Sequence, residues 1–182
     1  MHREVAPMDI DSLPGLSKRP IETVECRIKP LDEMCSKLAP LYSFWNTKRG
    51  TRRFPSKDEI NPREIKEFLK DVILLRVIDA GNDFEFRIVG DGLIQAFGGN
   101  FQGRTASRFA KLANITELAH RPVACEGEPR LLEYWIRFSD LPVYHRETLF
   151  LPLGQGDTAD HILAMGSAKP IFPERAQCRE MA

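Results

Sequence analysis

The segment from Asp83 to Arg104 constrains the fold more than any other part of the chain. Apolar residues at alternate positions are separated by Glu85 and Arg87, and this period of two is typical of a β-strand with two unlike faces. Gly90-Asp91-Gly92 then breaks the strand, a short apolar stretch predicts about one turn of helix, and further glycines follow that turn. These later glycines lie after the helical turn and not at its N-terminal end, so they are poorly placed to bind phosphate. The segment therefore predicts the wall and lid of a small cavity without indicating what fills it.

The rest of the chain divides into one domain with two extensions. Residues 1–30 contain four prolines and mixed charge, which predicts an extended N-terminal arm, although Ile21–Ile28 could also pair with an exposed strand edge. The polar residues 170–182 predict a flexible C-terminal tail. Residues 31–169 are long enough to form one domain with a core of ordinary size.

Two helical segments are expected before the first strand of that domain. In Leu31–Trp45 the apolar residues recur in steps of three and four, which is typical of an amphipathic helix. Pro40 interrupts the pattern, so either the helix kinks there or a second helix begins with this proline in its first turn. Further along, Asn61-Pro62-Arg63-Glu64 has the residues of a helix start, with Asn61 as the cap and Glu64 reaching back to it. It predicts a short helix that ends near residue 70.

The strand pattern predicts an α+β fold. Turn residues join the first two strands and the last three, and a helical segment over residues 106–124 lies between the two groups. We therefore expect a five-stranded antiparallel sheet with the helical insert on one face. The five expected strands are Val72–Asp79, Phe84–Val89, Leu131–Phe138, Val143–Leu153 and His161–Ala168.

Side-chain direction along these strands predicts a binding site between the sheet and the insert. Residues two apart on a strand share a face, so apolar groups of several strands can surround one interior together with those of the insert. The alternative is that the same side chains fill this interior and leave no cavity. The predicted site residues are Phe86, Ile88, Asp91, Phe97, Phe101, Arg104, Phe109, Tyr134, Ile136, Leu149 and Leu151.

Two charged residues near this site have alternative roles. Asp91 is either the N-terminal cap of the following helical turn or a contact for the ligand. Arg87 points to solvent, pairs with a carboxylate across the sheet such as Glu133 or Glu147, or binds an anionic group of a ligand.

Composition and spacing argue against several functions. The 26 basic and 26 acidic side chains cancel, so a nucleic-acid partner is not expected, and the basic run at residues 48–57 reads as a solvated loop. The scattered cysteines and histidines match no metal-ligand spacing, and we find no catalytic nucleophile with a neighbouring base, so neither a metal site nor an enzyme is predicted. No apolar run approaches the ~18 residues of a membrane span, and the N-terminus does not resemble a signal peptide, so a cytoplasmic protein is expected.

The order of these features resembles a PAS domain, and most closely the single-domain PAS proteins common in alphaproteobacteria. The resemblance covers roughly residues 38–169 and depends on the order and spacing of many short matches. The matching residues are Tyr42, Trp45, Pro55, Ser56, Asp58 or Glu59, Ile60, Pro62, Phe84, Arg87, Val89, Gly90, Gly98 or Gly99, Gly103, Arg104, Leu149, Leu151, Pro152, Leu153, Ile162, Leu163 and Ala164. Asp91 departs from the pattern, because the family usually has a small hydroxyl residue there.

The resemblance implies a cytoplasmic sensory or regulatory module that acts through a signalling partner, with a small ligand held between sheet and insert as the input. It also implies self-association, for which the apolar stripe of Leu31–Trp45 is the expected homodimer contact. The cofactor stays unknown: the cysteine motif of flavin-type PAS domains is missing, and His120 is either a haem ligand or a surface or capping histidine. A ligand-free scaffold of the same fold, and a small enzyme with its site between Asp91, Arg104 and the insert, are the alternatives.

Overall fold

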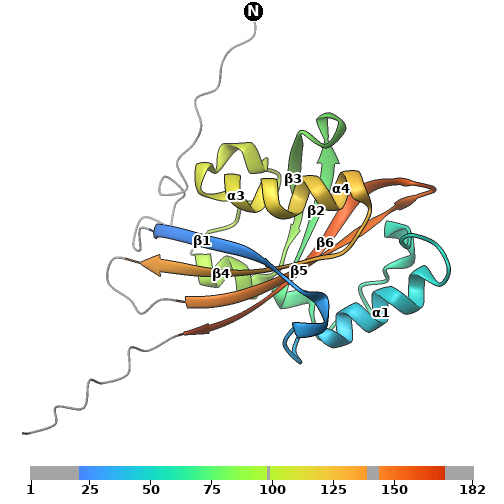
Figure 1. Ribbon diagram of the computed structural model, residues 1–182, viewed down its shortest axis with the longest axis horizontal. Coiled ribbons are helices and arrows are strands. Elements are labelled where there is room, and N and C mark those ends of the chain that lie inside the picture. Colours follow the sequence, from blue (N-terminus) through green and yellow to red (C-terminus); the bar gives the residue numbers. More distant parts are fainter. Residues whose placement is uncertain (1–20, 98, 139–143, 171–182) are drawn as a thin grey trace, which may run out of the picture.

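One antiparallel sheet of six strands organises the part of the chain that the computed structural model describes, residues 21–97, 99–138 and 144–170. The strand order is β1-β4-β5-β6-β2-β3, and every neighbouring pair is antiparallel (Figure 1). The strands are β1 (Ile21–Lys29), β2 (Val72–Ile78), β3 (Asp83–Val89), β4 (Arg130–Phe138), β5 (Tyr144–Gln155) and β6 (Thr158–Pro170).

Strand β1 is the reason why the sheet has six strands and not the expected five. It pairs along its length with β4, and in this register Cys26 lies opposite Tyr134. The alternative that Ile21–Ile28 pairs with a strand edge is therefore confirmed. The predicted number of strands, five, was too low by one. The cause is non-local: β4 offers an edge to which a short extended segment between Pro20 and Pro30 can bind. The predicted arm before residue 21 and tail after residue 170 lie outside the described residues.

Tight turns close the β2–β3 and β5–β6 hairpins, as the turn residues predict, and the β4–β5 connection lies outside the described residues. The β2–β3 hairpin turns through η6 (Asp79–Gly81), where three consecutive residues have positive φ: 49° at Asp79, 51° at Ala80 and 90° at Gly81. Gly156, with φ of 61°, serves the β5–β6 turn. Since a non-glycine residue in this region costs roughly 1–2 kcal/mol, the β2–β3 turn is held by the pairing of its flanking strands.

The N-terminal helix is shorter than Leu31–Trp45 and begins with the proline in its first turn. The chain forms a 3₁₀ turn, η3 (Leu31–Glu33), and then the helix α1 (Ala39–Arg49). Leu38, Leu41 and Trp45 are fully buried in the core of their own chain, and Trp45 Nε1 donates a hydrogen bond to the Pro152 carbonyl oxygen at 2.9 Å. These three residues therefore cannot form the predicted homodimer contact, because they pack within their own chain, and the homodimer itself stays a prediction.

The predicted helix after residue 61 is replaced by turns. The Asn61 side chain accepts the Arg63 backbone N–H at 2.9 Å, but Glu64 pairs with Lys48 and does not reach back to the cap. Turns lead from there to η5 (Leu69–Asp71). The capping box occurs earlier, between Ser56 and Glu59 at η4 (Lys57–Glu59). Two similar cap signals lie close together here, and local sequence did not distinguish them.

The insert between β3 and β4 is a chain of short helical pieces. The run from α3 through η9 to α4 is continuous and crosses one face of the sheet (Figure 1). Its η9 segment is a π-helix, and Gly127 with φ of 67° ends α4. The pieces are α2 (Asp91–Phe97), η7 (Ala106–Arg108), η8 (Ala110–Leu112), α3 (Ala113–Ile115), η9 (Thr116–His120) and α4 (Arg121–Glu126).

The sheet separates two apolar cores. We call the side covered by the insert the insert face and the side covered by α1 the α1 face (Figure 1). The insert-face core is Leu75, Phe84, Phe86, Val89, Leu93, Phe101, Ala106, Phe109, Ile115, Ala119, Val123, Leu132, Tyr134, Phe150, Ile162 and Ala164. The α1-face core is Leu38, Leu41, Trp45, Phe54, Ile65, Phe68, Val72, Leu131, Leu149, Leu151, Leu153, Ala159, Leu163 and Met165.

Candidate functional site

Four of the predicted site residues meet on the insert face. Phe86, Phe101, Phe109 and Tyr134 all belong to the insert-face core and are buried. The Phe86 ring centroid lies 4.8 Å from that of Phe101 and 6.0 Å from that of Phe109, in edge-to-face arrangements that aromatic pairs favour. These rings form the aromatic part of the candidate site, and their contact with a ligand stays a prediction.

Ile88 points away from this site because β3 contains a bulge. Leu75 pairs with Phe86 while the neighbouring Leu74 pairs with Ile88, so Arg87 is an extra residue in the strand. An extra residue reverses the side-chain alternation beyond it. Ile88 is consequently 46% exposed, and Val89 occupies the core in its place. The prediction for Ile88 is wrong.

Arg87 itself pairs within its own strand. Its Nη1 lies 3.1 Å from Glu85 Oε1, and its side chain is half exposed. Neither Glu133 nor Glu147, the carboxylates suggested across the sheet, is its partner.

Leu149 and Leu151 lie on the α1 face, in the core that contains Trp45. The prediction for them is also wrong, because their neighbour Phe150 belongs to the insert-face core. Residues 149–153 read Leu-Phe-Leu-Pro-Leu, so both faces of this strand are apolar and the pattern does not say which face the insert covers.

The glycine-rich loop runs along the outer edge of β3. Gly103 donates its N–H to the Phe86 carbonyl oxygen at 2.7 Å, and the Arg104 carbonyl oxygen accepts the Phe86 N–H at 2.9 Å. Arg104 is half-buried, and Asp91 is exposed at the first residue of α2. The side chains of Phe97 and Ile136 lie outside the described residues. The loop therefore protects an edge of the sheet, besides supplying Phe101 to the site.

His120 lies beside this aromatic cluster, whereas the sequence left it as either a haem ligand or a surface or capping histidine. It is 4% exposed at the end of the π-helix η9. Its ring centroid lies 5.2 Å from that of Phe84 and 5.5 Å from that of Phe150, and its Nδ1 is 3.2 Å from Thr116 Oγ1. Burial lowers the pKa of His120 to about 4, against a smaller opposing effect of the Asp83 carboxylate. The side chain is therefore neutral at pH 7.

Polar side chains continue this surface toward β5. The Tyr134 hydroxyl and Thr148 Oγ1 are 2.7 Å apart, and both groups are buried. Arg146, the register partner of Tyr134, is also buried, and its guanidinium lies where a side chain at Gly166 would be. The insert face thus combines aromatic rings with a neutral imidazole, two hydroxyls and one cation.

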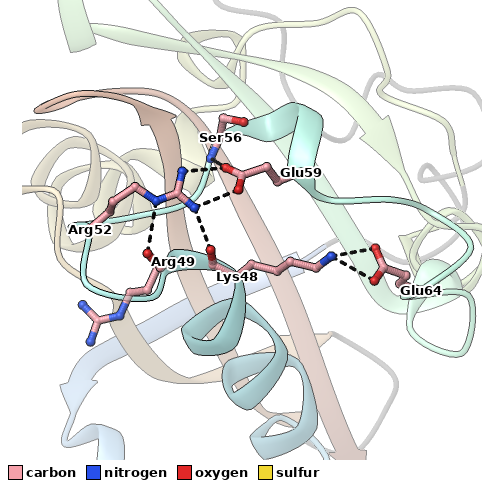
Figure 2. A network of polar contacts seen from close by, with 6 residues as sticks. All are labelled: Lys48, Arg49, Arg52, Ser56, Glu59 and Glu64. Carbon is pink, nitrogen blue, oxygen red and sulfur yellow. Dashed lines mark hydrogen bonds and ion pairs between the residues drawn. The ribbon is translucent and has the colours of Figure 1, made fainter.

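Two cations of the basic run at residues 48–57, Lys48 and Arg52, pair with nearby carboxylates, as Figure 2 shows. Arg52 donates from Nη1 and Nη2 to the two oxygens of Glu59, at 2.9 and 2.8 Å, and from Nη2 to the Lys48 carbonyl oxygen at 2.7 Å. Lys48 Nζ is 2.9 Å from both oxygens of Glu64. These cations join the end of α1 to the following turns.

Within the described part of the chain, no helix is both long and apolar enough to cross a membrane.

Comparison with known proteins gives a family. No curated protein and no solved structure matches the chain. The family model PAS_5, described as a PAS domain, matches residues 34–168. This match spans most of the chain and agrees with the antiparallel sheet and its helices, so the protein belongs to the PAS domain family.

Proposed function

We propose that this PAS protein is a cytoplasmic sensory or regulatory module that passes its signal to a partner protein by direct contact. Membership of the PAS family supports the sensory role, since the presence of a PAS domain suggests a sensory or regulatory module. The identity of the partner is left to experiment, because a fold alone does not name one.

In this proposal a small ligand between the sheet and the insert is the input. The observation that carries it is the burial of His120 in a π-helical turn against Phe84 and Phe150. Single π-helical turns occur frequently at functional sites, because they bring a side chain out of the regular helical path. A ligand at His120 touches insert and sheet together, so it can favour one arrangement of the insert over another.

Native mass spectrometry of the freshly purified full chain tests the input. We expect an additional mass of a few hundred daltons on the wild type, either as purified or after incubation with a metabolite extract. Phe109→Trp enlarges a ring inside the site and should abolish the adduct, whereas Ser43→Ala, on the exposed side of α1, should keep it. Bare-chain mass under every condition contradicts a ligand-gated module.

A ligand-free scaffold of the same fold is the second candidate. It is favoured by the mutual packing of Phe86, Phe101 and Phe109, whose ring centroids are 4.8 to 6.2 Å apart. Rings at these distances fill much of the interior themselves. Bare-chain mass in the experiment above is the result that this candidate predicts.

Self-association is part of the proposed output, through a surface other than the buried stripe of α1. Strand β1 ends the strand order of the described sheet, and its Ile28 is 50% exposed. An end strand can pair with a second copy of itself. We expect a dimer mass in size-exclusion chromatography with light scattering and a monomer mass for Ile28→Glu. A monomer mass for both proteins removes the homodimer from the proposal.

A further inference from the structure

Two glutamates face each other on the α1 face, on the side of the sheet opposite to the proposed ligand site. Glu133 on β4 and Glu147 on β5 are direct register partners. Each is 7% exposed. Like charges directly opposite one another destabilise a strand pair, and the loss of water makes their repulsion stronger. The pair therefore requires positive charge close by.

A histidine completes a set of three ligand groups. His145 Nε2 is 2.6 Å from Glu133 Oε1. One ligand atom from each of Glu133, His145 and Glu147 lies within 4.8 Å of the other two. Metal–ligand bonds of about 2.0–2.2 Å place two ligands of one ion up to about 4 Å apart, so small side-chain shifts bring all three within reach of one ion. The imidazole favours zinc and its neighbours over magnesium or calcium, which prefer oxygen ligands.

Supporting groups hold two of these ligands in place. The Cys35 backbone N–H donates to Glu147 Oε2 at 2.9 Å. The indole ring of Trp135 lies beside the imidazole of His145, with centroids 5.5 Å apart. A hydrogen bond such as that from Cys35 fixes the direction of the Glu147 carboxylate, and bonds of this kind usually raise the affinity of a metal site.

Cations of β1 now compensate the carboxylates. Arg27 Nη2 is 2.6 Å from Glu133 Oε2, and Lys29 Nζ is 2.8 Å from Glu147 Oε1. The two cations differ in exposure: 67% of the Arg27 side chain is accessible to solvent, against 17% for Lys29. Arg27 is therefore the cation that can turn into solvent, provided that another positive charge takes its place beside the buried Glu133.

We propose that Glu133, His145 and Glu147 bind a divalent transition metal of the zinc class, and that Arg27 leaves Glu133 as the metal enters. The ion takes over the charge compensation that Arg27 provides, and Lys29 stays with Glu147 Oε1. Of the three ligand side chains His145 is the most exposed, at 25% against 9% for each glutamate, so we expect the metal to enter beside it. Because the site uses the face away from the insert, it is independent of the proposed ligand site.

Isothermal titration of the full chain with zinc chloride, after treatment with a chelator, tests the site. We expect one zinc ion per chain. His145→Gln keeps a hydrogen-bond donor for Glu133 but removes the metal ligand, so it should weaken binding about 10-fold or more. His161→Gln is the matched control, because His161 also pairs with a carboxylate, Asp160, at 2.7 Å, yet lies outside the site. It should bind zinc like the wild type.

Arg27→Ala tests the displacement. Without the competing guanidinium, the Arg27→Ala protein should bind zinc severalfold more tightly than the wild type. Separately, the wild type should show a higher melting temperature with zinc than without it. Circular dichroism verifies that each variant is folded. The absence of stoichiometric zinc binding, or equal affinity in wild type and His145→Gln, overturns the site. Equal or weaker affinity in Arg27→Ala overturns the displacement.

Discussion

At the scale of single residues, Arg146 on the neighbouring strand explains why residue 166 is a glycine. A Cβ atom at this position would collide with the buried guanidinium of Arg146. We expect Gly166→Ala to lower the free energy of unfolding by about 1–3 kcal/mol in urea, because overpacking displaces a side chain that has little room to move. In an Arg146→Ala background the same change should cost much less. Equal costs in both backgrounds would show that the arginine is not the cause.

His120 should make stability depend on pH. Its pKa is about 4 in the folded protein and 6.5 ordinarily, so the unfolded chain binds the extra proton first as the pH falls. The contribution of the neutral His120 to the free energy of unfolding is complete above pH 6.5. It is lost as the pH falls from 6.5 to 4, by up to about 3 kcal/mol. Urea unfolding of wild type and His120→Leu at pH 7 and pH 5 measures it. The wild type should lose more stability than the variant over this interval; parallel losses would contradict a buried neutral imidazole.

At the scale of elements, helix α1 is attached to the sheet by its buried stripe. Leu41→Ala should lower the free energy of unfolding by about 2–5 kcal/mol, because Leu41 is fully buried between the helix and the sheet. Ser43→Ala, two residues away on the exposed side of α1, should change it by no more than about 0.5 kcal/mol. Similar effects of the two substitutions in urea denaturation would mean that α1 is not docked in this way.

The joint between α1 and η4 can be followed through one carboxylate. Hydrogen bonds from Arg52, and then from the Ser56 backbone, lower the pKa of Glu59 from 4.5 to about 2. A folded pKa below the unfolded value means that the contribution to stability is present above pH 4.5 and is lost as the pH falls toward 2. The effect on stability is small, since the pair is exposed and screened.

Nuclear magnetic resonance should therefore find a titration midpoint for Glu59 near 2. The midpoint should rise toward 4.5 in Arg52→Ala and stay unchanged in Lys57→Ala, because Lys57 pairs with Asp58. An ordinary midpoint in the wild type would contradict the joint drawn in Figure 2.

The sequence predicted those elements whose structure depends on neighbouring residues. It failed for features that depend on contacts between residues far apart in the chain. The β2–β3 and β5–β6 hairpins follow from turn residues beside their strands, and Pro40 offered the observed start of α1 as one of two alternatives. The bulge at Arg87 has no glycine or proline to mark it, so Ile88 was assigned to the wrong face. The faces of β5 could not be distinguished, since both are apolar. The burial of His120 depends on how the insert lies over the sheet, which periodicity does not contain.

At the scale of the whole molecule, both cores share one sheet, so they should unfold together. Leu41→Ala in the α1-face core and Phe109→Ala in the insert-face core should each shift one common transition to lower urea concentration. Tryptophan fluorescence and far-ultraviolet circular dichroism should report the same midpoint for each protein. Separate midpoints would show that the insert unfolds on its own while the α1 side remains folded.

The place of β1 in the sheet has a consequence for how the protein is made. Arg27 and Glu133, which pair in the finished protein, stand 106 positions apart in the chain. At about 5–20 residues per second, a ribosome delivers the docking partner of β1 roughly 5–20 s after β1 itself. During that interval the backbone N–H and C=O groups of β1 have no strand to pair with. The sheet can therefore be completed only after the second half of the chain has been synthesised.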